Sequence, residues 1–499
     1  MKENNKVSRR GFLGTGAAAA AAITILPSNT IAGLGHKAPS DKMNIAGVGV
    51  GGMGFGNLKN LKSENIVGLC DVDWKYSDNC FKAFPEAKKY KDWRRMYDEL
   101  GKSIDGVMVA TADHTHAIIA AHAITQGKSV YVQKPLTHTV YESRLLTKLA
   151  DKYKVATQMG NQGSSAEGVN LTCEWIANGE IGEVSKVEAF TDRPIWPQGL
   201  NTPKQGQWVP ETLDWDLFTG PAQMRPYNEL YHPWNWRGWW AYGTGALGDM
   251  ACHILHPVFM GLQLGYPIKA QGNSTLLLQD CAPTAQSVKL TFPARPTAKA
   301  AKVKLPQVEV YWYDGGIKPM LPAGWPAGKN PNDQGGCVFF HGTKGILVCG
   351  CYGVNPWILR PDGSVSKPEN APKFRRRVAP LSHEMDWVRA AKEAPETRVK
   401  TASDFSQSGP FNEMVVMGVL AVRLQTLNKE LEWEGPNMKF TNITDSEKIK
   451  IVLEDKFSIK DGHPTFEKVY TDAVPATDFA AELIKHTYRA PWSLPPMPA

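Results

Sequence analysis

The chain has 499 residues, of which 42% are hydrophobic and 21% charged, values typical of a globular protein with two or three domains. Its net charge of +7 is dispersed, and the one dense basic block, Phe374–Arg377, is too short to favour nucleic-acid binding. The eight cysteines contain no C-x-x-C pair, so we expect buried thiols and no structural zinc site.

Residues 1–32 have the form of a twin-arginine (Tat) export signal. Arg9 and Arg10 precede a Phe-Leu pair and an alanine-rich apolar run that is too short to span a membrane. A polar linker follows at 33–41, and because it contains no cysteine we expect no lipid anchor. The prediction is a protein exported by the Tat route to the periplasm or beyond. That route carries folded proteins, so a tightly bound cofactor would be exported with the chain.

The segment after the linker predicts a nucleotide-binding turn between a strand and a helix. An apolar run, Met43–Val48, is followed by a G-x-G-x-x-G pattern whose glycines allow a tight turn, close approach of a pyrophosphate, and close packing of helix on strand. A second register begins at Gly47, and the first is preferred because it leaves the full strand intact. The cofactor-binding candidates of the turn are Gly49, Gly51, Gly52, Met53 and Gly54.

A second apolar run, "NIVGLC", ends at Asp71. An acidic side chain at the end of the second strand accepts hydrogen bonds from the adenosine ribose hydroxyls and repels a 2′-phosphate. Asp71 therefore favours NAD over NADP.

Apolar runs then alternate with helical patterns as far as residue 163, which predicts a doubly wound parallel sheet, a Rossmann domain at 42–163. Polar clusters follow three of these runs, at Thr111–His116, Gln133–Pro135 and Gly160–Ser165. Ligands bind at the carboxyl ends of parallel strands, so we expect these clusters to line the site. They add Thr111, His116, Gln133, Lys134 and Gln162 to the cofactor-binding candidates.

The order of these motifs resembles the Gfo/Idh/MocA oxidoreductases, in particular a Tat-exported branch related to glycoside 3-dehydrogenases and NAD-dependent glycosidases. The matching residues are the three glycines, Thr111, His116, Lys134 and Pro135. Two positions depart from the family pattern. Ala112 replaces a proline, and Gln133 replaces a glutamate whose loss leaves the charge balance of Lys134 open.

The resemblance implies a second domain, at 164–499, of the α+β class with a large open, mostly antiparallel sheet, and a homo-oligomer, either dimer or tetramer. Apolar segments punctuated by Gly and Pro between residues 287 and 365 are typical of such a sheet. A long amphipathic helix is predicted at 411–429. The charged stretch at about 450–485 fits none of these elements, and an insertion is one interpretation.

A predicted helix at 245–264 carries Asp249 and His253 on one face, one turn apart. A carboxylate so placed can orient an imidazole and raise its basicity, and an exposed ion pair is the alternative. The resemblance favours the first interpretation, because the family carries acid/base Asp and His residues in this kind of segment.

Aromatic residues cluster upstream of this helix and indicate a carbohydrate substrate, because sugar C–H faces lie well on indole rings. At least one of the adjacent Trp239 and Trp240 is expected to belong to the core. The cluster contains Trp196, Trp234, Trp236, Trp239, Trp240 and Tyr242, with Arg237 among them. The substrate-binding candidates are His114, Trp236, Arg237, Tyr242 and His253.

Two functions remain open. The first is an NAD-dependent oxidoreductase acting on a sugar or glycoside hydroxyl, by expectation at C3, with His253 as base, Asp249 as its orienting residue and Lys134 stabilising the developing alkoxide. The second is a redox-neutral NAD-dependent glycosidase that oxidises the sugar, eliminates the leaving group, adds water and reduces the ketone again. That route needs another base, His114 or Tyr242. Asp113–His116 could suggest a metal site, but no third ligand stands at a fixed spacing, so none is expected.

Overall fold

The computed structural model describes residues 41–296, 302–373 and 382–498. The predicted Tat signal, the linker up to residue 40 and the Arg375–Arg377 block lie outside these ranges. All eight cysteines lie within them as buried free thiols, as expected. Across the described residues, no helix combines the length and apolar composition needed to cross a bilayer.

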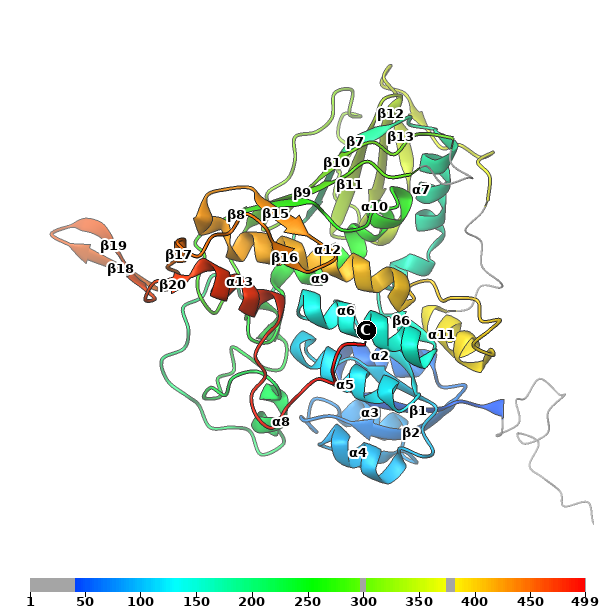
Figure 1. Ribbon diagram of the computed structural model, residues 1–499, viewed down its shortest axis with the longest axis vertical. Helices are drawn as coiled ribbons and strands as arrows, with labels where there is room; N and C mark the ends of the chain where they lie inside the picture. The colour runs from blue at the N-terminus through cyan, green and yellow to red at the C-terminus, as the bar shows by residue number, and fades with distance from the viewer. Residues whose placement is uncertain (1–40, 297–301, 374–381, 499) are drawn as a thin grey trace, which may run out of the picture.

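The N-terminal part of the described chain forms the predicted Rossmann domain (Figure 1, blue to cyan). All its strand pairs are parallel, in the order β3-β2-β1-β4-β5-β6. Buried apolar runs form the central strands, and a capping box of Thr139 and Glu142 begins the last helix. The strands are β1 (Asn44–Val48), β2 (Asn65–Cys70), β3 (Lys88–Tyr90), β4 (Gly106–Val109), β5 (Ser129–Val132) and β6 (Thr157–Met159). The helices are α2 (Gly52–Asn60), α3 (Asp78–Ala83), α4 (Trp93–Leu100), α5 (Asp113–Thr125) and α6 (Val140–Tyr153).

The second domain contains a ten-stranded sheet in which the β7–β10 pair runs parallel and the other pairs antiparallel. The expected fold class is therefore confirmed. The order is β14-β13-β12-β11-β7-β10-β9-β8-β15-β16. The strands are β7 (Val184–Thr191), β8 (Lys269–Ser274), β9 (Gln286–Phe292), β10 (Val308–Tyr313), β11 (Gly336–Gly342), β12 (Gly345–Gly350), β13 (Trp357–Leu359), β14 (Val365–Ser366), β15 (Leu431–Glu434) and β16 (Lys439–Phe440).

Two helices between β14 and β15 in the chain pack back on the Rossmann domain. α11 (His383–Lys392) places Trp387, which is fully buried, in a cluster with Ile45, Met108 and Tyr131. α12 (Phe405–Arg423) lies between the domains, against α6 and β8 (Figure 1). The Rossmann core thus draws on residues far beyond the predicted boundary at 163.

The helix predicted at 245–264 is divided in the structure. α9 (Gly245–Ile254) ends before α10 (His256–Gly261), and Pro257 stands in the first turn of α10. A proline lacks the amide hydrogen that a continuous helix requires, which explains the break. α7 (Glu167–Asn178) packs beside α10.

Shorter elements complete the fold. Residues 450–485 include a protruding hairpin, β18 (Val452–Lys460) with β19 (His463–Tyr470), followed by α13 (Ala476–Ile484) (Figure 1). The paired Phe457 and Phe466 of this hairpin are exposed. The remaining elements are η3 (Gln162–Ser165), α8 (Trp215–Thr219), η4 (Asn235–Gly238), η5 (Cys351–Gly353), η6 (Gln425–Leu427), β17 (Lys448–Ile449) and β20 (Val474–Pro475).

Candidate active site

The glycine turn between β1 and α2 needs glycine at its first and third motif positions. Gly49 has φ +77°, and a Cβ there would lie 2.6 Å from the backbone of Ala110 and Thr111. A Cβ on Gly54 would lie 1.9 Å from the carbonyl oxygen of Gly49. β1 ends at Val48, so the geometry agrees with the preferred register.

The second glycine position has a neighbour that sequence reasoning missed. A Cβ on Gly51 would lie 2.2 Å from Cδ1 of Tyr76, whose ring covers the turn, and Gly52 faces the Tyr76 hydroxyl. Met53 is half exposed beside them. Gly51 therefore makes room for Tyr76 within the protein, in addition to the space it leaves for a pyrophosphate.

Asp71 ties the end of β2 to the glycine turn. Its Oδ2 accepts hydrogen bonds from the backbone amides of Val50 and Gly51, at 2.8 and 3.1 Å. Burial raises the pKa of Asp71 despite these hydrogen bonds. The side chain lines the cavity described next, so its carboxylate can both hold the turn and face a ribose.

A cavity of about 530 Å³ runs along the carboxyl ends of the parallel strands and on to α9. Its size lies within the range of small-molecule sites, and the glycine turn at its wall fits a dinucleotide. Most of the predicted residues line it: Gly49, Gly51, Gly52, Met53, Asp71, Thr111, His114, Gln133, Lys134, Gln162, Trp236, Arg237, Asp249 and His253.

Two predicted contacts require correction. His116 is 1% exposed and does not line the cavity; its Nδ1 lies 2.8 Å from the carbonyl oxygen of Pro135, its Nε2 3.1 Å from that of Thr111. It therefore joins the segments after β4 and β5 instead of facing the cofactor. Tyr242 is fully buried beside Phe218 and does not line the cavity, so it contacts no substrate there.

Lys134 receives its counter-charge from Asp249. Its Nζ donates to Oδ1 of Asp249 at 2.8 Å, and Nε of Arg237 donates to the same oxygen at 3.2 Å. Burial opposes ionisation of Asp249, but the charges of Lys134 and Arg237 hold its pKa at about 2. Gln133, which stands where the family has glutamate, donates to Oδ1 of Asn57. Asp249 therefore balances the charge of Lys134.

His253 is not held by Asp249, contrary to the sequence-based prediction. Its Nδ1 has no hydrogen-bond partner among the described residues, and its ring packs on Tyr352 with centroids 4.6 Å apart. Burial, assisted by the charge of Lys134, lowers the pKa of His253 to about 3. The imidazole of His253 is therefore neutral at physiological pH.

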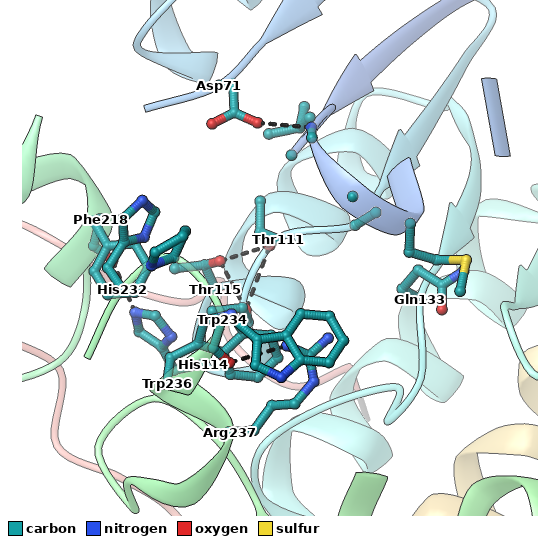
Figure 2. A pocket seen from close by; sticks show the side chains of 18 of the residues that line it. Asp71, Thr111, His114, Thr115, Gln133, Phe218, His232, Trp234, Trp236 and Arg237 are labelled. Carbon is teal, nitrogen blue, oxygen red and sulfur yellow. Dashed lines mark hydrogen bonds between the residues drawn. The ribbon is translucent and has the colours of Figure 1, made fainter. Parts of the chain in front are cut away.

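An aromatic wall faces these polar groups. The guanidinium of Arg237 lies over the rings of Trp234 and Trp236, at 3.9 and 4.3 Å from their centroids (Figure 2). Trp196 also lines the cavity, whereas Trp239 and Trp240 are buried away from it. The arrangement combines apolar ring faces with a fixed cation, as recognition of a polyhydroxylated ring requires.

His114 also presents a neutral ring to the cavity. Its Nε2 lies 3.0 Å from the carbonyl oxygen of Phe218 and so carries the hydrogen, while Nδ1 has no partner among the described residues. Burial lowers the pKa of His114 to about 3.

The cavity residues that sequence reasoning missed include Tyr76, Tyr352 and Trp492. Tyr352 has φ +63°, which is uncommon for a residue with a side chain and concentrates at functional sites. Its place after an apolar run between Cys351 and Gly353 was the one available signal. Among the described residues, no cluster of His, Cys, Asp and Glu side chains has the form of a metal site.

Comparisons with known proteins match each of the two domains to a family model. Residues 42–161 match the model of the Gfo/Idh/MocA oxidoreductase family for its NAD-binding Rossmann fold, and residues 180–294 match its C-terminal alpha/beta domain. Glucose-6-phosphate 3-dehydrogenase of Bacillus subtilis is 24% identical over 144 residues, 28% of this chain and 40% of that protein. A glycosyl hydrolase family 109 protein of Shewanella pealeana is 25% identical over 228 residues, 41% of this chain and 50% of that protein.

These two matches thus span half or less of the relatives' own lengths. Among solved structures, the WlbA dehydrogenase of Bordetella pertussis, in complex with NADH and UDP-GlcNAcA, superposes with a TM-score of 0.52 at 15% identity. That alignment covers 79% of this chain and 99% of the other, and at this identity it shows the fold alone.

Proposed function

Because the chain carries the NAD-binding Rossmann domain and the C-terminal domain of the Gfo/Idh/MocA oxidoreductases, we propose that it is an NAD-dependent oxidoreductase acting on a hydroxyl of a sugar or glycoside. The observation that carries the proposal is that one cavity joins the glycine turn and Asp71 to Lys134, His253 and the aromatic wall. The name of the Bacillus relative supports C3 as the oxidised position.

Bound NAD would accept a hydride from the carbinol carbon. The chain's own groups handle the proton and the charge. Lys134, anchored by Asp249, donates to the substrate oxygen and stabilises the negative charge that develops there. His253, neutral at physiological pH, takes the hydroxyl proton. Trp236 and Arg237 hold the sugar ring.

The redox-neutral glycosidase remains the second candidate, and the family 109 relative favours it. In that route the ketone at C3 acidifies the C2 proton, a base removes it, the glycosidic oxygen leaves, water adds, and the hydride returns to C3. His114, whose ring lines the cavity, is the candidate for the C2 base. Tyr352 takes the place of the buried Tyr242 as an alternative.

The remaining proposals concern the export of the protein, its affinity for NAD and its oligomeric state. Export by the Tat route rests on the N-terminal sequence alone. Tight binding of NAD is supported by the walls that both domains contribute to the cavity. A homo-oligomer, dimer or tetramer, is supported by the exposed apolar face of the hairpin, where Phe457, Ile459 and Phe466 are 62, 66 and 65% exposed.

The test starts from the purified full chain. Dinucleotide is released by heat and quantified, and glycosides with a chromogenic leaving group are then supplied. NADH absorbance that persists until an acceptor sugar is added indicates the dehydrogenase; leaving-group release without lasting NADH indicates the glycosidase. Lys134→Ala and His253→Ala should abolish either activity, whereas His463→Ala, in the exposed hairpin, should not. Full activity of the first two variants would refute the site.

A further inference from the structure

The C-terminal segment leaves α13 and runs back over the Rossmann domain (Figure 1, red). It is firmly anchored on the way. Arg489 pairs with Asp216 at 2.7 Å and donates two hydrogen bonds to the carbonyl oxygen of Gly220, at 3.1 and 2.9 Å. The Tyr488 hydroxyl donates to Oε1 of Glu142 in α6 at 2.7 Å. The segment therefore has a defined path across two separate parts of the protein.

This path places Trp492 in the wall of the cavity. Its indole is 8% exposed and lines the cavity together with Trp93 at the start of α4. The two ring centroids are 6.3 Å apart, and the guanidinium of Arg94 lies 4.4 Å from the Trp492 ring. Arg94 is itself held by Asp92 at 2.7 Å. The indole is thus fixed on one side by protein and contributes its remaining surface to the cavity wall.

The strand order shows which end of the cavity this is. Lys134 follows β5, Asp71 follows β2, and Trp93 follows β3 at the sheet edge. The reacting groups thus lie toward β5, and the acidic residue at the end of β2 marks the ribose of the adenosine half. The cavity residues that lie beyond Asp71 toward β3 therefore face the adenine base of the adenosine half.

We infer that Trp492 of the C-terminal segment and Trp93 of the Rossmann domain together form the wall that binds the adenine of NAD. An adenine ring is flat and aromatic, and stacking of a nucleic-acid base on an aromatic side chain has a substantial sequence-independent affinity. The apolar side chains of Ile119 and Leu217 line the same cavity. The C-terminal segment therefore completes the cofactor site.

The inference rests on NAD binding and not on the proposed sugar chemistry, so binding is what is measured. The full chain is stripped of dinucleotide, and dissociation constants are determined for NAD, ADP-ribose and nicotinamide mononucleotide. In Trp492→Leu, which keeps an apolar side chain without an aromatic face, NAD and ADP-ribose should bind about 10-fold more weakly. Nicotinamide mononucleotide should bind as in the wild type, because it lacks the adenine half.

Two further variants serve as controls for the Trp492→Leu measurement. Trp492→Phe retains an aromatic face and should restore affinity to within about threefold of the wild type. Trp208→Ala removes a tryptophan that is 96% exposed and should change nothing. The inference is overturned if Trp492→Leu binds ADP-ribose as the wild type does, if it weakens nicotinamide mononucleotide equally, or if Trp492→Phe fails to restore binding.

Discussion

Replacing Asp249 with asparagine tests the charge arrangement at the centre of the site. The side chain keeps its size but loses the charge that faces both Lys134 and Arg237. The pKa of Asp249 is held at about 2, below its ordinary 3.8, which corresponds to about 2 to 3 kcal/mol favouring the folded carboxylate. This contribution is fully present above about pH 4 and is lost as the pH falls through 2. At pH 7 we expect Asp249→Asn to lower the free energy of unfolding by that amount.

The measurement is urea unfolding of the full chain at pH 7, with Asp461→Asn, in the exposed hairpin turn, as the matched control. The partner is identified by a double-mutant cycle. Because Asp249→Asn leaves the Lys134 ammonium unpaired, adding Lys134→Met should recover part of the loss. The double variant should be at least about 1 kcal/mol more stable than the sum of the single effects predicts.

The cycle also separates this arrangement from the one expected from the sequence. If Asp249 served to hold His253, its effect would couple with His253→Asn and add independently to Lys134→Met. That outcome would refute the assignment of Asp249 to Lys134, as would an Asp249→Asn variant as stable as the Asp461→Asn control.

Three other predictions concern stability and the cofactor turn. Buried histidines with lowered pKa values bind protons only in the unfolded state; they include His114, His116, His253 and His486. Between about pH 4 and 6.5, each should therefore reduce the free energy of unfolding by about 1.4 kcal/mol per pH unit as the pH falls. The melting temperature should be lower at pH 5.5 than at pH 7.5, and a constant value would contradict this. Gly54→Ala should reduce the amount of bound dinucleotide and lower the melting temperature, because the added Cβ would clash with the carbonyl oxygen of Gly49. The control Gly56→Ala, whose added Cβ has its nearest contact 4.0 Å away, should keep the dinucleotide content and the melting temperature of the wild type. Equal behaviour of the two variants would contradict the prediction. A fragment of residues 42–163 should lack a cooperative unfolding transition, because it lacks Trp387. Removing such a side chain from the core costs about 3 to 5 kcal/mol. A sharp transition in calorimetry would show that the fragment folds alone and would contradict the prediction.

Local patterns in the sequence were sufficient to predict the Rossmann domain and its glycine turn. Strand-length apolar runs alternating with helical patterns predicted the Rossmann domain, and the spacing of Gly49, Gly51 and Gly54 predicted its turn. Each of these signals depends on residues close together in the chain. Lys134 and Asp71 could be found for the same reason, since each stands within two residues of the end of a strand.

Only the tertiary structure decided which side chains meet. Asp249 and His253 share a helix face, yet Asp249 pairs with Lys134, which approaches from another domain. Trp492 and Trp93 form one wall although nearly four hundred residues separate them. Helical spacing limits which residues can be neighbours on one element, whereas the packing of one element against another selects the partner. Charge and shape complementarity across that packing depend on the whole fold, which no local pattern records.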